Sequence, residues 1–244
     1  MSELNLTGRA DLHIHTTASD GIHTVRQVLE HITRMGSLDV IAITDHDCLD
    51  ASLWAYQQRH QYPFDIVPGL EVTSVDGHVL ALWVTSPIPA YLSLQETVAA
   101  IHEQDGIAVL AHPLELTIAP QTFWRYLTQP EVLLKAGVDA VEVFNAGAFT
   151  VGCNQLAKLA YRNKQIPQLG GSDSHMCATI GRGVTRFRGR TAAELRESIA
   201  NGLTSAEGMR WGITAYLRLS RSFIRRKLTE FSTEKQHSVH QTPA

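Results

Sequence analysis

The sequence has few cysteines and no long hydrophobic run. Cys48, Cys153 and Cys177 are odd in number and form no C-x-x-C pair, which argues against a disulfide framework or a thiolate zinc site. No apolar stretch reaches the roughly 20 residues that a transmembrane helix needs, so we expect no transmembrane segment. Residues 1–6 lack the basic and apolar regions of a signal peptide. These absences favour a cytoplasmic protein.

Charged residues are also few, and they are unevenly distributed. They make up 18% of the 244 residues, against 44% hydrophobic residues, which indicates a globular rather than a disordered chain. Residues 209–231 carry six basic residues and one acidic residue, a net charge of +5, whereas the whole chain carries −3. The remainder therefore carries −8, which suits a cluster of acidic metal ligands better than a broad nucleic-acid surface.

Apolar, β-branched runs alternate with helical patterns along the chain. Capping boxes begin three of the expected helices, at Thr24, Ser93 and Thr191. Further helical patterns cover residues 49–60, 121–136 and 151–163. The expected strands span residues 10–15, 39–44, 65–72, 78–84, 107–112, 139–144 and 166–170. This alternation predicts an α/β fold with a parallel sheet closed or nearly closed into a barrel, in preference to an open doubly wound sheet.

The chain is expected to have three parts. Residues 1–208 would form the barrel, residues 209–231 a basic amphipathic helix, and residues 232–244 a disordered tail, because the tail is polar and has no periodicity. The basic helix could bind a membrane surface or steer nucleic acid. A helix docked on the barrel with its arginines in solvent is the favoured interpretation, since an amphipathic stripe is the default for a surface helix.

The most informative stretch is Asp11-Leu12-His13-Ile14-His15. In a strand, alternate side chains share one face, so the aspartate and both histidines are expected to point the same way. Four later apolar runs also end in ligand-type residues, in Thr44-Asp45-His46, Gly69-Leu70-Glu71, Ala111-His112-Pro113 and Ser172-Asp173-Ser174-His175. A barrel gathers the C-terminal ends of its strands on one rim, whereas an open sheet would spread them apart. The repetition therefore predicts one shared site.

A set of imidazoles and carboxylates on one rim predicts bound metal, because burying such groups without a partner is unfavourable. The nine candidate ligands are His13, His15, Asp20, His46, Glu71, His78, His112, Asp173 and His175. With four to six ligands for each ion, this supply implies two or three divalent ions, and the mixed donor set favours Mn, Zn or Fe over Ca or Mg. Ions about 3.5–4 Å apart clamp an anionic oxygen and generate hydroxide at neutral pH, the chemistry of phosphoester hydrolysis.

Together with Ser19-Asp20-Gly21, these ordered motifs resemble the polymerase and histidinol phosphatase (PHP) family, over residues 9–202. The resemblance implies a distorted seven-stranded β/α barrel with up to three metals. It is strongest to the stand-alone phosphoesterases, which include a 5'-to-3' exoribonuclease and a nucleoside 3',5'-bisphosphate phosphatase. By the resemblance, one ion would bind His13, His15, Glu71 and Asp173, a second Glu71 and His112, and a third Asp20, His46 and His175. His78 could ligate metal or contact phosphate.

The expected activity is hydrolysis of phosphomonoesters or nucleotide phosphoesters by a metal-bridging hydroxide. The partner would be a small phosphorylated substrate or the 5' end of a short nucleic acid. Asp45 is expected to orient an imidazole or to supply a proton to the leaving group. Asn145 ends a strand on the same rim and could contact metal or substrate, or could simply pack. Glu142, on the same strand, could face either way.

Phosphate binding is assigned to Arg182. Relatives that hydrolyse nucleotides often carry a cation just after the His-Pro motif, where this chain has Leu114-Glu115-Leu116-Thr117. Arg182 lies nearest the last motif and could replace that cation. Arg186, Arg188 and Arg190 alternate and are expected to share one strand face, where Arg188 and Arg190 more simply form a solvated edge.

Two other functions compete with hydrolysis of phosphoesters. Amidohydrolases also begin with H-x-H on a barrel strand, but many of them use a carboxylated lysine at a strand end, and no lysine lies on an expected strand here. A PHP-like module could also bind metal without catalysis and support a partner or nucleic acid. The intact ligand set argues against that second alternative, because a structural site needs no open metal positions.

Overall fold

The computed structural model describes residues 5–221 and 224, and its internal contacts divide the chain into residues 1–210 and 211–244. The strands of the first unit are β1 (Gly8–Asp11), β2 (Val40–Ile43), β3 (Asp65–Ser74), β4 (Gly77–Leu82), β5 (Ile107–Leu110), β6 (Ala140–Asn145), β7 (Gln168–Gly171), β8 (Gly183–Phe187) and β9 (Thr204–Gly208). Its helices are α1 (Val25–Met35), α2 (Asp50–Gln57), α3 (Leu94–His102), α4 (Pro120–Thr128), α5 (Glu131–Lys135), α6 (Cys153–Tyr161) and α7 (Ala192–Ala200), with short 3-10 turns η1 (Arg59–Gln61) and η2 (Cys177–Thr179).

The strands form one mixed sheet in the order β7-β6-β5-β4-β3-β2-β1-β8-β9. The pairs β1·β2, β2·β3, β5·β6 and β6·β7 are parallel, as the βα repeats predict. β4 is antiparallel to both β3 and β5, and β8 is antiparallel to both β1 and β9. The sheet is therefore mixed rather than wholly parallel, since the tight turn after β3 reverses the chain and β8 enters the sheet from the opposite direction.

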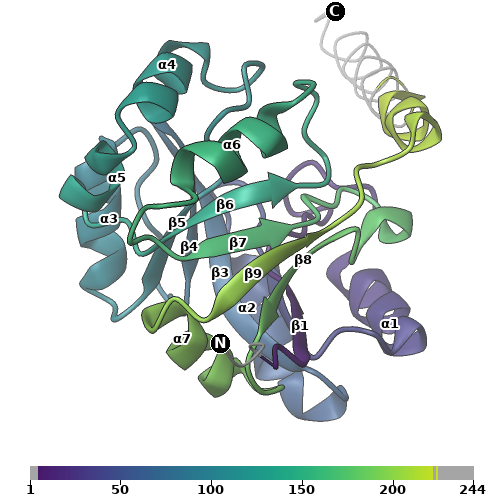
Figure 1. Ribbon diagram of the computed structural model, residues 1–244. Helices are drawn as coiled ribbons and strands as arrows, with labels where there is room; N and C mark the ends of the chain where they lie inside the picture. The colour runs from purple at the N-terminus through teal and green to yellow at the C-terminus, as the bar shows by residue number, and fades with distance from the viewer. Residues whose placement is uncertain (1–4, 222–223, 225–244) are drawn as a thin grey trace, which may run out of the picture. The chain divides into compact units, whose positions relative to one another are not determined.

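The sheet curves until its two ends meet, so the barrel is nearly closed. β7 lies beside β8 and β9 (Figure 1). The Thr185 side chain joins the ends, accepting a bond from the Gly170 N–H at 3.1 Å and donating to the Gly170 carbonyl at 2.9 Å. Gly183 permits this approach, because a Cβ there would lie 1.9 Å from the Gly171 carbonyl oxygen. The predicted barrel is confirmed, with side-chain contacts completing its last seam.

Apolar side chains fill the barrel and one helix covers its lower end. A single buried cluster takes residues from β1, β2, β3, β4, β5, β6, β7 and β8, together with Leu195 and Ile199 of α7. Those α7 side chains place the helix beneath the sheet, as Figure 1 shows. The opposite end, where the parallel strands terminate, is left as the place for a site.

The helices begin largely as the local sequence predicts. All three capping boxes are present, at Thr24, Ser93 and Thr191, and Gly36 ends α1 in the left-handed conformation with φ of 60°. The long helix expected over residues 121–136 is instead two helices, α4 and α5, separated at Gln129 and Pro130. The break has a physical cause, because proline has no N–H and clashes with the preceding turn of a helix.

The second unit is described only in part. Residues 213–221 are helical and residues 209–212 are not, so the helix begins later than the expected range of residues 209–231. The rest of that helix, apart from residue 224, and the predicted tail at residues 232–244 lie outside the described residues. Across the part of the chain that the structure describes, every helix is too short or too polar to traverse a bilayer.

Candidate metal centre

Most of the ligand-type residues lie just past strand ends, whereas Glu71 lies within β3 and His78 near the start of β4. β1 ends at Asp11, earlier than expected, and beyond it only Ile14 forms a bridge, to Ser174. His13 and His15 nevertheless share a site, with ring centroids 5.2 Å apart. A second bridge joins His46 to Glu71. Irregular backbone just past the strands thus carries the side chains toward a common centre.

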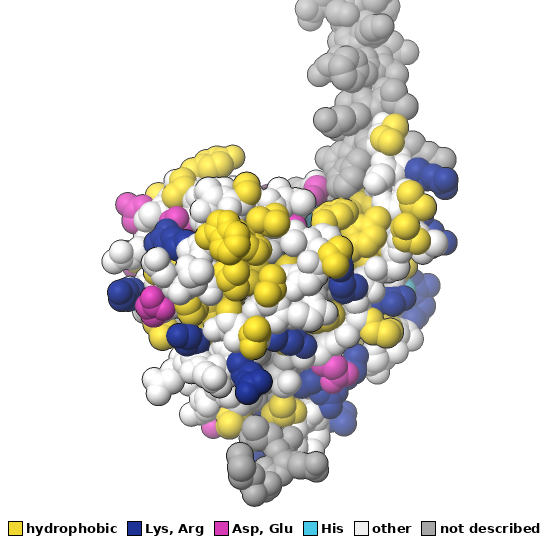
Figure 2. Space-filling view, turned by 45° about the horizontal axis from the view of Figure 1, so that its top comes forward, with side chains coloured by type: hydrophobic (Ala, Val, Ile, Leu, Met, Phe, Trp, Pro, Cys, Tyr) yellow, Lys and Arg dark blue, Asp and Glu magenta, His cyan; other side chains and the backbone are white. Residues whose placement is uncertain are grey.

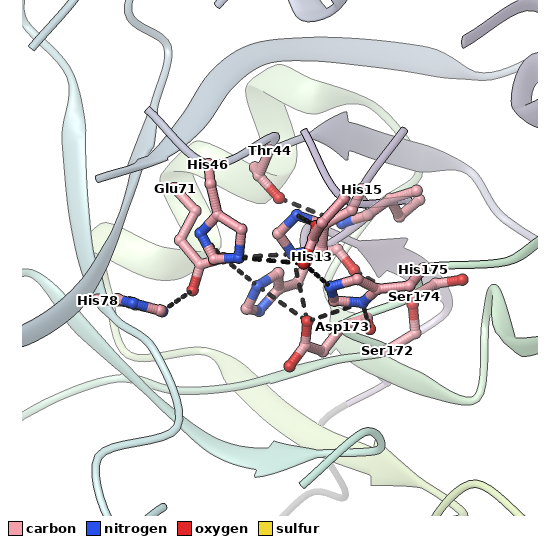
Figure 3. A network of polar contacts seen from close by, with 12 residues as sticks. His13, His15, Thr44, His46, Glu71, His78, Ser172, Asp173, Ser174 and His175 are labelled. Carbon is pink, nitrogen blue, oxygen red and sulfur yellow. Dashed lines mark hydrogen bonds and ion pairs between the residues drawn. The ribbon is translucent and has the colours of Figure 1, made fainter. Parts of the chain in front are cut away.

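Glu71 is the centre of this site. Its carboxylate is 1% exposed and lies within 3.3 Å of a ring nitrogen of five histidines. Its Oε2 atom lies 3.1 Å from His13 Nε2, 3.2 Å from His15 Nε2 and 3.3 Å from His46 Nδ1. Its Oε1 atom lies 2.9 Å from His78 Nδ1 and 3.1 Å from His112 Nε2. Figure 3 shows the imidazoles turned toward this carboxylate from several strand ends.

Asp173 and Asp20 extend the cluster on its other side. Asp173 Oδ1 lies 3.2 Å from His15 Nε2 and 3.5 Å from His13 Nε2. Asp20 Oδ2 lies 3.0 Å from His175 Nε2 and 3.9 Å from His46 Nε2. The His15 and His175 rings stack with centroids 4.2 Å apart. These contacts connect the two aspartates through shared histidines.

Four overlapping groups of ligand atoms result, each with its atoms within 4.8 Å of one another. The groups are His15, Asp20, His46 and His175; His13, His15 and Glu71; His13, His112 and Asp173; and His46, Glu71 and His78. Together they contain all nine side chains that the sequence analysis nominated. The shared members make this one continuous cluster of candidate ligands.

The donor atoms fit bound cations. Among the described residues, His13 Nε2, both ring nitrogens of His15 and Glu71 Oε2 are buried and make no hydrogen bond. His13 Nε2 and His15 Nε2 both lie close to Glu71 Oε2, but neither pair has the geometry of a hydrogen bond. Orphaned buried polar atoms are costly, and a divalent ion between them would satisfy imidazole and carboxylate donors at once. The residues present therefore suit a divalent metal.

Electrostatics at the centre favour positive charge. Burial by itself would lower the pKa of His15, but Asp173 and Glu71 outweigh it and raise the pKa to about 10. Burial opposes ionisation of Glu71, but His13 and His46 outweigh it and hold its pKa well below the usual range. A cavity with this balance of charge attracts cations.

Glu142 supports the cluster from behind. Its Oε1 atom lies 3.0 Å from His13 Nδ1, and its Oε2 atom accepts hydrogen bonds from the His112 N–H at 3.1 Å and the Asn145 amide at 2.9 Å. A carboxylate on the far nitrogen fixes the ring and raises its basicity as a ligand. Gly171 leaves room for it, because a Cβ there would lie 2.2 Å from Glu142 Oε1.

The backbone at two of these positions is strained. His112 and Asp173 have φ of 27° and 50°, in the left-handed region that non-glycine residues rarely adopt. Such conformations cost about 1–3 kcal/mol each and concentrate at functional sites. Each residue lies two positions after the last residue of its strand, His112 after β5 and Asp173 after β7.

Two aspartates near the cluster bond to backbone and hydroxyl groups. Asp45 contacts no imidazole among the described hydrogen bonds, and instead accepts three from the Thr16 N–H, the Thr16 hydroxyl and the Ser19 hydroxyl, at 2.6–2.7 Å. It therefore braces the loop that leads to Asp20. Asp11 is absent from the ligand groups, because its carboxylate accepts the backbone N–H groups of Ser172 and Gly181.

Arg182, the arginine assigned to phosphate binding, and the alternating arginines after it do not line the cavity above the metal cluster. Arg182 is exposed and is absent from the described residues that line the cavity over the cluster. Arg186 donates to the Leu6 carbonyl and lies 3.7 Å from Glu207. Arg190 lies 3.6 Å from Asp39. β8 ends at Phe187, so the alternating arginines do not share one strand face.

A cavity of about 210 Å³ opens over the cluster. It is lined by Asp20, His46, Glu71, His78, His112, Glu115, Thr117, Ile118, Asn145, Gly147, Ala148, Phe149, Asp173 and His175. Asn145 bonds Asp173 Oδ2 at 3.1 Å through its amide nitrogen, while its carbonyl oxygen is buried without a hydrogen bond. Asn145 thus lines the cavity over the cluster, where the sequence left contact with metal or substrate and simple packing both open. The wall from residues 147–149 was missed, because small and aromatic residues carry no ligand signal.

Known proteins share this sequence and fold. Residues 153–204 match the family model described as PHP-associated. An uncharacterized protein of Methanocaldococcus jannaschii is 29% identical over 57% of this chain and 82% of its own length. The 5'-3' exoribonuclease Rnm of Escherichia coli is 32% identical, over 40% of this chain and 36% of its own length.

A solved structure gives the same result for the fold. The two-domain protein from Bacteroides vulgatus, described as containing a PHP-like metal-dependent phosphoesterase, superposes with a TM-score of 0.68 at 20% identity. That match covers 82% of this chain and 64% of the Bacteroides chain. The ordered motifs, the barrel and these relatives together support a member of the PHP family.

Proposed function

We propose that this protein is a metal-dependent phosphoesterase that hydrolyses phosphomonoesters or nucleotide phosphoesters. The observation that carries the proposal is the position of Glu71, buried among five imidazoles with donor atoms that lack hydrogen bonds. The E. coli relative is an exoribonuclease, which supports a nucleotide or the 5' end of a short nucleic acid as substrate.

The four overlapping ligand groups support two or three divalent ions, with Mn, Zn or Fe suited to the mixed donors. One ion would bind His13, His15, Glu71 and Asp173; a second would bind Glu71 and His112; a third would bind Asp20, His46 and His175. His78 lies 2.9 Å from Glu71 and would complete the coordination near His46. Such ions supply a nucleophile from water at neutral pH and neutralise the phosphoryl oxygens.

The protein's own residues would fix and shape this centre. Glu142 holds the His13 ring in one orientation through Nδ1, which leaves Nε2 directed at Glu71. Asn145 joins Asp173 to Glu142 through its amide nitrogen. These groups keep the donors in place before the substrate arrives, which is the property that a catalytic centre requires.

The size of the cavity favours a terminal phosphate. Ligand sites for whole drug-sized molecules usually measure about 300–1,000 Å³, whereas this cavity measures about 210 Å³. A phosphoryl group and part of a sugar would fill it, and the rest of the substrate would lie at the rim. This size is consistent with cleavage at the end of a chain or of a free monoester.

The test is hydrolysis by the purified full-length protein supplied with Mn, Zn or Fe. Substrates would be nucleoside monophosphates, simple phosphomonoesters and short 5'-phosphorylated oligonucleotides. We expect turnover that disappears in His13→Ala and persists in His60→Ala, which changes an exposed histidine outside the cluster. Turnover no greater than that of His13→Ala on every substrate would overturn the proposal.

A further inference from the structure

Two rim loops bring hydrophobic side chains to the cavity over the metal cluster. Ile118 follows β5 and Phe149 follows β6, and both line the cavity. The two side chains are 38% and 58% exposed. Figure 2 shows hydrophobic side chains gathered on the face that lies at the top of Figure 1. A large apolar side chain at the edge of a polar cavity commonly marks a binding surface.

The loop that carries Phe149 is held at both ends. At its start, the Ala146 N–H donates to the Gly171 carbonyl at 3.0 Å. At its end, the Thr150 N–H donates to Glu115 Oε2 at 3.0 Å, and the Thr150 hydroxyl donates to Oε1 of the same carboxylate. Glu115 is 4% exposed, so this anchor is buried and little screened.

The middle of the loop is held as well. The Arg210 guanidinium donates to the Ala148 carbonyl and, at 3.3 Å, to the Phe149 carbonyl. These bonds fix the backbone on either side of the aromatic ring. A surface ordered before binding loses little entropy when a ligand arrives, so its contacts contribute more to affinity.

We propose that Phe149, with Ile118 beside the same cavity, binds the flat aromatic base of a nucleotide substrate. This inference rests on the proposed function, because the metal cluster at the floor would hold the phosphoryl group. The cavity, at about 210 Å³, is smaller than the sites that usually enclose a whole drug-sized ligand, so we place the base at the rim, where these two side chains are exposed. Any base can stack on an aromatic ring. The protein would therefore bind nucleotides more tightly than phosphates that lack a base, and its affinity would differ little from one base to another.

The test is equilibrium binding to the full-length, Mn-loaded protein. The probes are the phosphonate analogues of adenosine 5'-monophosphate and of ribose 5-phosphate, in which a CH2 group replaces the bridging oxygen and prevents hydrolysis. We expect the wild type to bind the adenosine analogue about fivefold or more tightly than the ribose analogue. Phe149→Ala should remove that preference and leave affinity for the ribose analogue unchanged. Phe149→Trp should retain it.

A matched control is Val151→Ala, which truncates an exposed residue of the same loop that does not line the cavity and should bind both analogues as the wild type does. A wild-type preference that survives in Phe149→Ala would overturn the inference and leave the proposed function standing. Absence of metal-dependent binding of either analogue to the wild type would overturn the proposed function, and this inference with it.

Discussion

The Oε1 atom of Glu142 lies 3.0 Å from Nδ1 of His13, while Nε2 of the same ring lies 3.1 Å from Glu71. The imidazole therefore lies between two buried carboxylates, one at the centre of the site and one behind it. Removing a side chain that orients a metal-binding histidine in this way usually lowers metal affinity by about 10- to 100-fold.

Glu142→Gln should therefore weaken metal binding by about 10- to 100-fold with little change in fold. The amide keeps the shape of the side chain but loses the charge that makes His13 a stronger ligand. Calorimetric titration of Mn into the metal-free protein measures this change. The control is Glu103→Gln, which changes an exposed carboxylate outside the four ligand groups. Equal metal affinities of the two variants would contradict the assigned role of Glu142.

Gly171→Ala should destabilise the protein and disturb the same support. The added Cβ would lie 2.2 Å from Glu142 Oε1 and 2.8 Å from the Cβ of His13, and overpacking of this kind costs about 1–3 kcal/mol. Thermal unfolding should show a lower midpoint. Gly212→Ala adds a methyl group that meets only the Thr214 hydroxyl, at 3.9 Å, and should unfold as the wild type does.

Asp45→Ala should loosen the loop that carries Asp20. Its carboxylate accepts hydrogen bonds from Thr16 and Ser19, and buried donors left without an acceptor cost about 1–3 kcal/mol each. We expect a lower unfolding midpoint and weaker binding of the last Mn equivalent. Unchanged metal stoichiometry and stability, combined with loss of turnover, would instead favour proton transfer by Asp45.

Glu115 should make stability depend on pH. Burial would raise the pKa of this carboxyl, but hydrogen bonds from Thr150 and Thr117 outweigh it and lower the pKa below the usual 4.5. A lowered folded-state pKa contributes stability that is fully present above about pH 4.5 and is lost as the pH falls through the folded-state value. Glu115→Gln should therefore be less stable than the wild type at pH 7, and the difference in unfolding free energy should narrow below pH 4.5. A difference that is constant from pH 7 to pH 3.5 would contradict this role.

The sequence was sufficient to nominate the candidate ligands, because His13, His46, His112 and Asp173 come soon after buried strands and a barrel collects strand ends. It was also sufficient for α1, α3 and α7, whose capping boxes are local signals. Glu142 could not be oriented in advance. Every residue of β6 is buried, and the pairing of β6 with β7 shifts between Glu142 and Phe144, so side-chain alternation does not tell which face Glu142 takes.

The last two strands, β8 and β9, were not among the expected strands, also because their local sequence carries little strand signal. β9 is a mostly exposed edge strand of sequence Thr-Ser-Ala-Glu-Gly, which has no apolar alternation to indicate a strand. β8 contains Arg186 but ends before Arg188 and Arg190, so alternating charges suggested a longer strand than the chain forms. The seam that closes the barrel depends on Thr185 and Gly170, a contact between distant segments that no local pattern encodes.

Anomalous diffraction from crystals of the Mn-loaded protein tests the central claim most directly. We predict two or three peaks among the nine side chains, with one of them in contact with the Glu71 carboxylate, and their loss in Glu71→Ala. A metal-loaded crystal with no anomalous peak at these residues, or with peaks only at other places on the protein, would contradict the account.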